Sequence, residues 1–396
     1  MQISDRILNR LNVLKAIRRW EPVSRTKLAE ITGLSGGLIT QLTADLLARK
    51  LIVERRDLAK RNGRPRLNLE INAEGAIVIG ASQIGNGKLS TSFVDLSGNL
   101  LFSRDMALPN VTNLAELALA TASALDEAIT ESPFALSQIH RVGILLAAVV
   151  DARKGIVHFM TTLPPGPEQF AQKIAEVLNL PVSIENEMTA MARAEHWFGR
   201  AIKYDSFTII NVGYSLGSAR YLDGLPCTGA NGISAEIGHT KVEFGSHARP
   251  CYCGARGCTS MYTSMYGILQ ADGSLEQFSF QEVERLDGMF QQLLARADGG
   301  EAKAISLLNQ AGEKLGITVA NHINAADPGE VLILLPDDRM RRFISEQFES
   351  SLAENVLPGL QANTGITFDV ANPNWSQKGF ASLALEQTFL TTEKLL

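Results

Sequence analysis

The chain contains little cysteine, with only four such residues among 396. Small secreted domains stabilised by disulfides are dense in cysteine, so the composition excludes that class. Long apolar runs are also absent, since residues 142–150 and 331–335 are the longest and fall far short of the roughly 20 residues that span a bilayer. The N-terminal segment lacks the apolar core and cleavage site of a signal peptide. We therefore expect a cytoplasmic protein with reduced thiols and no membrane segment.

The charge is unevenly distributed along the chain. Residues 1–70 carry 15 Lys and Arg against 7 Asp and Glu, and the remainder carries 22 against 35, although the net charge is only -5. A basic head on an acidic body is typical of a phosphate-binding module joined to another domain. The alternative is an uneven surface that has no partner.

The basic head has the pattern of a helix-turn-helix. Apolar residues recur at three- and four-residue spacing over residues 5–19, which predicts a helix. Ser24 can cap a second, short helix that Gly33 ends, and Ser35 can cap a third. Two short helices around a glycine turn are typical of a helix-turn-helix, in which the second presents its face to the major groove.

The expected exposed face of the third helix is small or polar and includes Gly37 and Thr43. With no arginine in the first two turns, arginine-to-guanine readout is not expected, whereas Gln41 suits adenine. The DNA-contact candidates on this helix are Ser35, Gly36, Thr40 and Gln41.

The basic segment "RDLAKRNGRPR" lies between two alternating, strand-like stretches and predicts a wing. Arg61, Arg64 and Arg66 surround a glycine and a proline there. An extended arginine segment suits a narrow, electronegative minor groove, so we expect the wing and the DNA shape to provide much of the specificity. The alternative is a solvated basic turn.

The acidic body predicts an α/β protein of two lobes. Strands followed by helices occur in two successive sets, the second beginning near "SFTIINVGY". The sequence contains no short exact repeat that would relate the two sets.

Three segments, "IENEMTAMARAE", "GLPCTGANGISAEIGHTKV" and "CYCGARGCTS", together with the head resemble the ROK family of repressors, open reading frames and kinases. The resemblance implies an actin-like (ribonuclease H-like) two-lobed sugar-kinase fold with an N-terminal winged helix-turn-helix. It places that domain at residues 1–72, the first lobe at 73–190 with a C-terminal helix at about 378–396, and the second lobe at 191–377.

The resemblance also implies a structural zinc site, because the family's histidine and three cysteines match His239, Cys251, Cys253 and Cys258. One imidazole and three thiolates suit a closed tetrahedral zinc site, which has no open position for catalysis. Reduced buried thiols without a metal are the alternative. His247 is a minor candidate ligand, and Cys227 is expected to be a small core residue.

The positions of kinase chemistry depart from the family pattern. Ser82 stands where kinases carry the aspartate of their first phosphate loop, and Tyr214 and Ser218 replace a threonine and a glycine of the second. Glu187 replaces the catalytic aspartate. Because the placement of a catalytic base tolerates little error, these departures predict that kinase activity is lost.

The family's hydroxyl-binding residues match Asn186, Glu187, Glu236 and His239, whereas a further glutamate is Ser260 here. The sequence therefore predicts a DNA-binding regulator of carbohydrate genes, most simply a repressor. It would bind a double-stranded operator as a homodimer or homotetramer and respond to a sugar-like effector between the lobes. The alternatives are a sugar kinase with a DNA-binding head and a regulator controlled by a partner protein. The alternative for Asn186 is a turn residue at the end of a strand, and for Glu236 it is a carboxylate that caps a helix or supports the zinc ligands.

Overall fold

The structure is a computed structural model that describes residues 5–56, 67–85, 87–160, 162–230, 232–276 and 283–390. The chain divides into two compact units, one of Met1–Lys203 with Asn374–Leu396 and one of Tyr204–Pro373. The boundary predicted after residue 190 falls inside helix α6 (Glu187–Phe198). Because α6 packs along α13 (Trp375–Leu390) within the first unit, the chain passes to the second unit only after Lys203.

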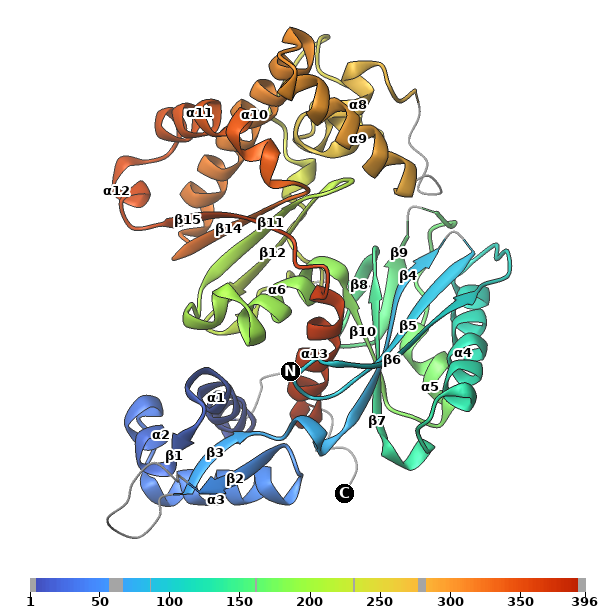
Figure 1. Cartoon of the computed structure of the whole chain (residues 1–396), viewed down its shortest axis with the longest axis vertical. Coiled ribbons are helices and arrows are strands. Elements are labelled where there is room, and N and C mark those ends of the chain that lie inside the picture. Colours follow the sequence, from blue (N-terminus) through green and yellow to red (C-terminus); the bar gives the residue numbers. More distant parts are fainter. Residues whose placement is uncertain are drawn as a thin grey trace. The chain divides into compact units, whose positions relative to one another are not determined.

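The head begins the first unit and has three helices, α1 (Asp5–Trp20), α2 (Arg25–Thr32) and α3 (Gly36–Ala48). Its sheet has the order β1-β3-β2 and is drawn in blue in Figure 1, with strands β1 (Val23–Ser24), β2 (Ile52–Arg56) and β3 (Leu67–Ile71). The predicted caps are confirmed, because the Ser24 and Ser35 side chains accept backbone N–H bonds at the starts of α2 and α3. Gly33 ends α2 with a φ of 68°, in the left-handed region that glycine enters without strain.

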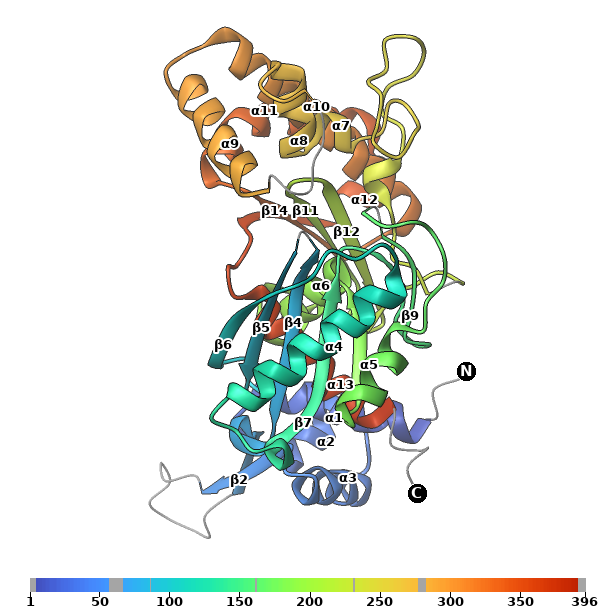
Figure 2. The ribbon, with the colours of Figure 1, turned by 90° about the vertical axis from the view of Figure 1, so that its right-hand side faces the viewer.

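The sheet of the first lobe has the order β10-β7-β4-β5-β6. Its strands are β4 (Ile77–Gly85), β5 (Lys88–Val94), β6 (Leu100–Ala107), β7 (Ile139–Leu146) and β10 (Val182–Asn186). Helices α4 (Leu114–Glu131) and α5 (Phe170–Leu178) cover one face (Figure 2), and α6 and α13 cover the other. Successive strand residues face opposite sides, so Ile79 packs under α4 and α5 while Val78 packs toward α6 and α13. A small hairpin joins β8 (Val149–Asp151) to β9 (Ile156–Phe159).

The second unit repeats this strand order as β15-β14-β11-β12-β13. Its strands are β11 (Phe207–Val212), β12 (Leu216–Leu222), β13 (Leu225–Pro226), β14 (Glu330–Leu335) and β15 (Gly365–Val370). Its helices are α7 (Ser260–Thr263), α8 (Met265–Asp272), α9 (Val283–Asp298), α10 (Ala302–Ala326), α11 (Asp338–Asn355) and α12 (Pro358–Gln361). In each sheet an antiparallel three-strand meander is followed by two parallel strands, which confirms the α/β fold.

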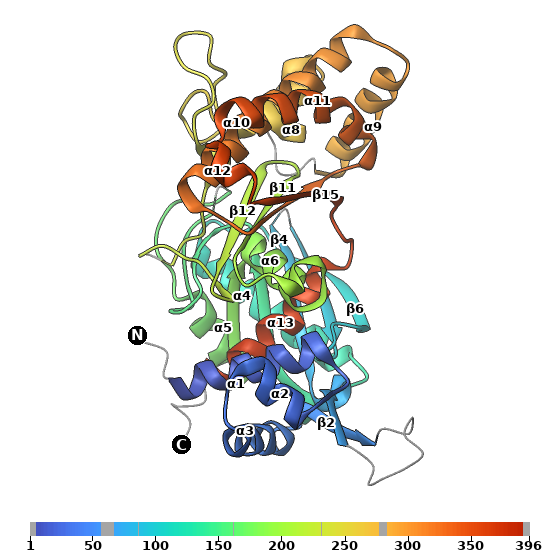
Figure 3. The same ribbon diagram turned by 90° about the vertical axis from the view of Figure 1, so that its left-hand side faces the viewer.

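The head is packed onto the first lobe through a shared apolar core. Buried residues of α1 belong to the same contiguous cluster as buried residues of α6 and α13, and Figure 3 shows α1 beside α13. Members of this cluster include Leu11, Leu14, Ile17, Trp197, Phe380 and Leu383. None of the helices in the described segments is long and apolar enough to cross a bilayer.

Candidate functional site

The first candidate site is the exposed face of α3. Ser35, Gly36, Thr40 and Gln41 are all exposed on it, so the predicted contact residues share one surface. The Thr40 hydroxyl donates to the Gly36 carbonyl at 2.9 Å, which leaves Gln41 as the long polar side chain of the first two turns. This face suits a close approach to base edges, because small residues do not hold the helix away from the groove.

Thr43 does not belong to that face, and the prediction that it is exposed is wrong. It follows Ile39 by four residues and therefore lies on the core side of the helix, where it is fully buried. Its hydroxyl accepts from Arg25 Nε at 2.9 Å and donates to the Thr40 carbonyl at 3.2 Å. Arg25 also pairs with Glu54 of β2 at 2.7 Å, so Thr43 helps to join α2, α3 and the wing strands.

The wing is described only at its base. Strands β2 and β3 are antiparallel, and their register pairs Arg56 with Leu67 where the hairpin leaves the sheet. The predicted contacts Arg61, Arg64 and Arg66 lie outside the described residues, so their role stays a prediction.

The second candidate site is a group of one histidine and three cysteines in the second unit. The ligand atoms of His239, Cys251, Cys253 and Cys258 all lie within 4.8 Å of one another. Cys251 Sγ is 3.7 Å from His239 Nδ1, and Cys253 Sγ is 3.7 Å from Cys258 Sγ. Sulfurs bound at about 2.3 Å to a tetrahedral metal would be about 3.8 Å apart. The spacing therefore fits a single metal ion, and the sequence prediction of a four-residue cluster is confirmed.

The surroundings of the cluster also fit a metal. Lys241 donates to Cys258 Sγ at 2.7 Å and to the His239 carbonyl at 3.0 Å, so its ammonium can offset thiolate charge. The hydrogen bond to Cys258 raises the pKa of Lys241, and burial raises the pKa of Cys251 to about 12. A metal bound to Cys251 would displace this thiol proton. The sequence analysis did not predict a role for Lys241, although its position two residues after His239 indicates that it lies near the cluster.

The two other sequence candidates lie elsewhere. Among the described residues, the candidate metal cluster includes His239 and not His247, which is exposed on the intervening loop. Cys227 is partly exposed, so the expectation that it lies in the core is wrong.

His239 can serve the metal and a ligand through different nitrogens. Its Nδ1 faces Cys251, and an imidazole that binds a metal through Nδ1 carries its proton on Nε2, where it can donate a hydrogen bond. The Tyr252 ring packs edge-on against His239 at 5.4 Å between centroids. Glu236 begins the same 3-10 turn (Ile237–His239) and is exposed as a whole residue, but partial desolvation of its carboxyl raises its pKa.

Asn186 and Glu187 lie in the first unit, where β10 passes into α6. Asn186 Oδ1 caps the helix by accepting from the N–H groups of Met188 and Thr189, and its Nδ2 donates to the Ala148 carbonyl at 3.0 Å. Asn186 thus ends strand β10 and caps α6, and these contacts leave its second amide hydrogen for a ligand. Glu187 is only partly buried, yet desolvation raises its pKa to about 7.

The side chains of the loop that matches the second kinase phosphate loop make contacts within the second unit. The Tyr214 hydroxyl donates to Asp287 of α9 at 2.8 Å, and the Ser218 hydroxyl donates to the Ala235 carbonyl at 2.6 Å. Ser260 is fully buried and accepts from the Leu216 N–H at 3.2 Å. These hydroxyls therefore stabilise the second unit itself.

The similarity to known proteins extends over nearly the whole chain. The xylose repressor of Caldicellulosiruptor bescii is 25% identical over 356 residues, which are 88% of this chain and 87% of that protein. The DNA-binding transcriptional dual regulator NagC of Escherichia coli is 24% identical over 357 residues, 90% of this chain and 87% of its own.

The fold is shared with a solved ROK family transcriptional regulator, a homolog of the E. coli MLC protein. The TM-score is 0.79 at 23% sequence identity, and the likeness covers 98% of both chains. The fold is therefore the actin-like α/β fold of that family. A model of the family matches residues 79–384, and the chain accordingly belongs to the ROK family.

Proposed function

We propose that the protein is a DNA-binding transcriptional regulator of carbohydrate genes, acting most simply as a repressor and without kinase activity. The observation that carries the proposal is the capped helix α3, whose exposed polar face is joined to a ROK body. The two relatives named above support it, because one is called a repressor and the other a DNA-binding transcriptional regulator.

The effector is a sugar or a sugar derivative recognised by Asn186, Glu187, Glu236 and His239. Amides, carboxylates and imidazole N–H groups suit hydroxyl groups because they accept or donate hydrogen bonds in defined directions. The name of the Caldicellulosiruptor bescii relative points to xylose, but the name of a relative does not select the sugar for this chain. Control by a partner protein instead of a sugar is the remaining alternative.

The metal is zinc, held by His239, Cys251, Cys253 and Cys258 in a purely structural role. When bound, it joins the turn at His239 to the cysteine loop and so fixes the backbone that carries Glu236. The active species is a homodimer or homotetramer on its operator.

The DNA-binding proposal is tested by selecting duplexes from a random-sequence library with the zinc-loaded, full-length protein. We expect enrichment of one symmetric site, bound at least about 1,000-fold more tightly than an unrelated duplex in fluorescence anisotropy. Equal affinity for the selected and unrelated duplexes would contradict the proposal. The effector is then sought by thermal melts against monosaccharides, amino sugars and sugar phosphates. A ligand at one hundred times its Kd adds about 2.7 kcal/mol of stability, and the Glu236→Ala variant should lose that shift.

A sugar kinase is the second candidate, and the pKa of Glu187 favours it, because a carboxyl with a pKa of about 7 suits a general base at neutral pH. Its test is ATP consumption with a panel of hexoses. We expect no turnover above the Glu187→Gln background, and turnover at ordinary enzyme rates would establish the kinase instead.

A further inference from the structure

Helix α6 joins two functional regions of the first unit. Its first turn is capped by Asn186, one of the proposed effector residues. Its last turn, at Trp197 and Phe198, lies against α1 of the DNA-binding head. The helix has twelve residues, so it spans about 18 Å between these two ends.

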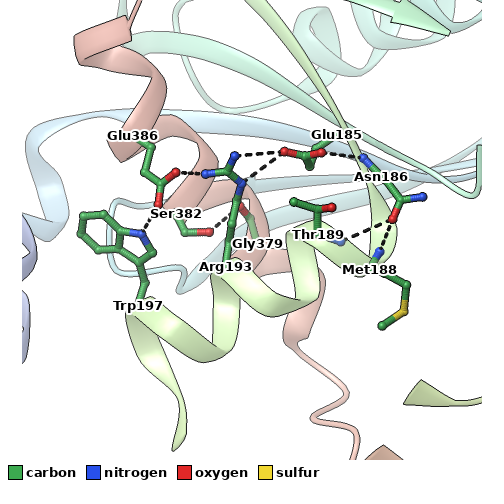
Figure 4. A network of polar contacts seen from close by, with 9 residues as sticks. All are labelled: Glu185, Asn186, Met188, Thr189, Arg193, Trp197, Gly379, Ser382 and Glu386. Carbon is green, nitrogen blue, oxygen red and sulfur yellow. Dashed lines mark hydrogen bonds and ion pairs between the residues drawn. The ribbon is translucent and has the colours of Figure 1, made fainter. Parts of the chain in front are cut away.

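A buried network of charges runs along α6 (Figure 4). Glu185 accepts from the Asn186 N–H at 3.0 Å and from Arg193 Nε and Nη2 at 3.2 and 3.1 Å. Arg193 also forms an ion pair with Glu386 of α13, and Glu386 accepts from Trp197 Nε1 at 2.7 Å. Glu185, Arg193 and Glu386 are 3%, 6% and 2% exposed, so these charges depend on one another rather than on water.

The contacts continue from α6 into the head. Arg18 of α1 donates through Nε to the Trp197 carbonyl at 3.1 Å, and its guanidinium lies 4.7 Å from the centre of the Phe198 ring. The same guanidinium pairs with Glu21, which accepts from the N–H of Ile71 in wing strand β3 at 2.7 Å. Six residues thus form an unbroken sequence of polar contacts, which we call the polar chain: Glu185, Arg193, Glu386, Trp197, Arg18 and Glu21.

Single contacts of the polar chain are costly to break while the others stay in place. Breaking one contact of a buried ion pair leaves an uncompensated charge in a medium of low dielectric constant, which is strongly destabilising. The apolar core on which it lies is also continuous from α1 to α6 and α13. Closely packed elements move between discrete arrangements and do not deform gradually. A shift of the first turn of α6 is therefore passed along the helix more readily than it is absorbed locally.

We propose that α6 and its polar chain couple the effector residues at the start of the helix to the DNA-binding head, with Arg193, Trp197 and Arg18 as the positioning residues. The proposal rests on the proposed function, which assigns effector binding to one end of α6 and DNA binding to the head at the other. The coupling itself is a property of the first unit and can be measured without DNA or effector.

The test is amide hydrogen exchange, followed by mass spectrometry, on the full-length protein and three variants. Arg18→Gln breaks the polar chain at the head, and Trp197→Phe removes the indole N–H while keeping an aromatic ring. Arg19→Gln is the matched control, because Arg19 lies in the same turn of α1 and donates to the Lys203 carbonyl at 2.9 Å, outside the polar chain. The measured quantities are the amide exchange rates of two peptides, one that contains Ile71 and one that contains Met188 and Thr189.

We expect Arg18→Gln to speed exchange by about tenfold or more in β3 and also at the first turn of α6, since hydrogen bonds to charged groups are strong. Trp197→Phe should affect both peptides, and Arg19→Gln should leave the first turn of α6 unchanged. An effect of Arg18→Gln confined to the head would overturn the coupling, and if that variant fails to fold, an effect of Trp197→Phe at only one end would do so. Failure to select an operator would instead contradict the proposed function alone.

Discussion

At the residue scale, two glycines shape the cysteine loop, and the structure distinguishes them. Gly254 and Gly257 have φ values of 86° and 75°, so both occupy the left-handed region. A Cβ on Gly257 would lie 1.9 Å from the Glu243 carbonyl oxygen, whereas one on Gly254 would meet no atom within 4 Å. Only Gly257 is therefore required for both its conformation and its lack of a side chain.

We predict that Gly257→Ala loses the bound metal, because the backbone must move to relieve the contact and the move displaces the neighbouring Cys258. Gly254→Ala should destabilise the fold by only about 1–2 kcal/mol, the cost of placing alanine in the left-handed region. This variant should keep about one zinc ion per chain. Metal analysis of the two purified variants checks this. Full zinc content in Gly257→Ala would show that the loop tolerates the clash.

The carboxyl of Glu187 gives the protein a defined dependence on pH. Burial raises its pKa to about 7 from an ordinary 4.5, so between these pH values the folded state binds more protons than the unfolded state. The contribution of Glu187 to stability therefore falls as the pH rises from 4.5 to 7.

We predict that Glu187→Gln, which cannot titrate, gains stability over the native protein progressively through this window and holds the gain above pH 7. Melting curves at pH 5, 6, 7 and 8 measure it. Glu127→Gln, at an exposed position of α4, is the control for the loss of a carboxylate charge. A difference that does not change with pH for Glu187→Gln would mean that its carboxyl is fully hydrated.

At the element scale, α3 has two faces with separate tasks. Gln41 is exposed on the face proposed to meet DNA, and Thr43 is buried against Arg25 on the other. The two positions are only two residues apart, so they provide a matched pair for separating recognition from stability.

We predict that Gln41→Ala weakens binding to the selected operator by roughly tenfold or more, as expected for loss of one base contact. Its unfolding free energy should change by less than about 0.5 kcal/mol. Thr43→Val should leave operator binding unchanged and lower the unfolding free energy by about 1–2 kcal/mol, because Arg25 loses a hydrogen-bond acceptor. Anisotropy titrations and thermal melts compare them. Unchanged operator affinity in Gln41→Ala would show that Gln41 makes no important base contact and would assign base recognition to the wing.

At the scale of the whole molecule, the metal cluster and the DNA-binding head belong to different units. All four ligands lie in the second unit, and the polar chain lies entirely in the first. Removal of the metal should therefore act first on the second unit.

We predict that removal of the metal with a chelator speeds hydrogen exchange in residues 232–276 and lowers the Tm of the first unfolding transition by about 10 °C. The reason is that structural zinc provides several kcal/mol, and each kcal/mol shifts Tm by about 2–4 °C in a unit of this size. Exchange in α1, α2 and α3 should stay as in the zinc-loaded protein, and re-addition of zinc should restore the transition. Equal loss of protection in both units would show that they unfold as one.

Much of this protein could be predicted from the sequence because the signals are local. Ser24, Gly33 and Ser35 delimit the helices of the head through bonds to residues three or four positions away. The cysteine loop brings three thiols together within eight residues, and glycines with left-handed φ values permit its turns. These features depend on chain geometry over a few residues, which the sequence alone determines.

Only the tertiary structure decided the features that join distant segments. Trp197 and Glu386 are 189 residues apart, and no local pattern indicates that they share a buried ion network with Arg193. The order of the two sheets is the same although the sequence has no short exact repeat, because strand order depends on backbone pairing and burial rather than on particular side chains. Thr43 was misplaced for a related reason: a small polar residue suits either face of a helix, and only its partner Arg25 on another helix fixes which face it takes.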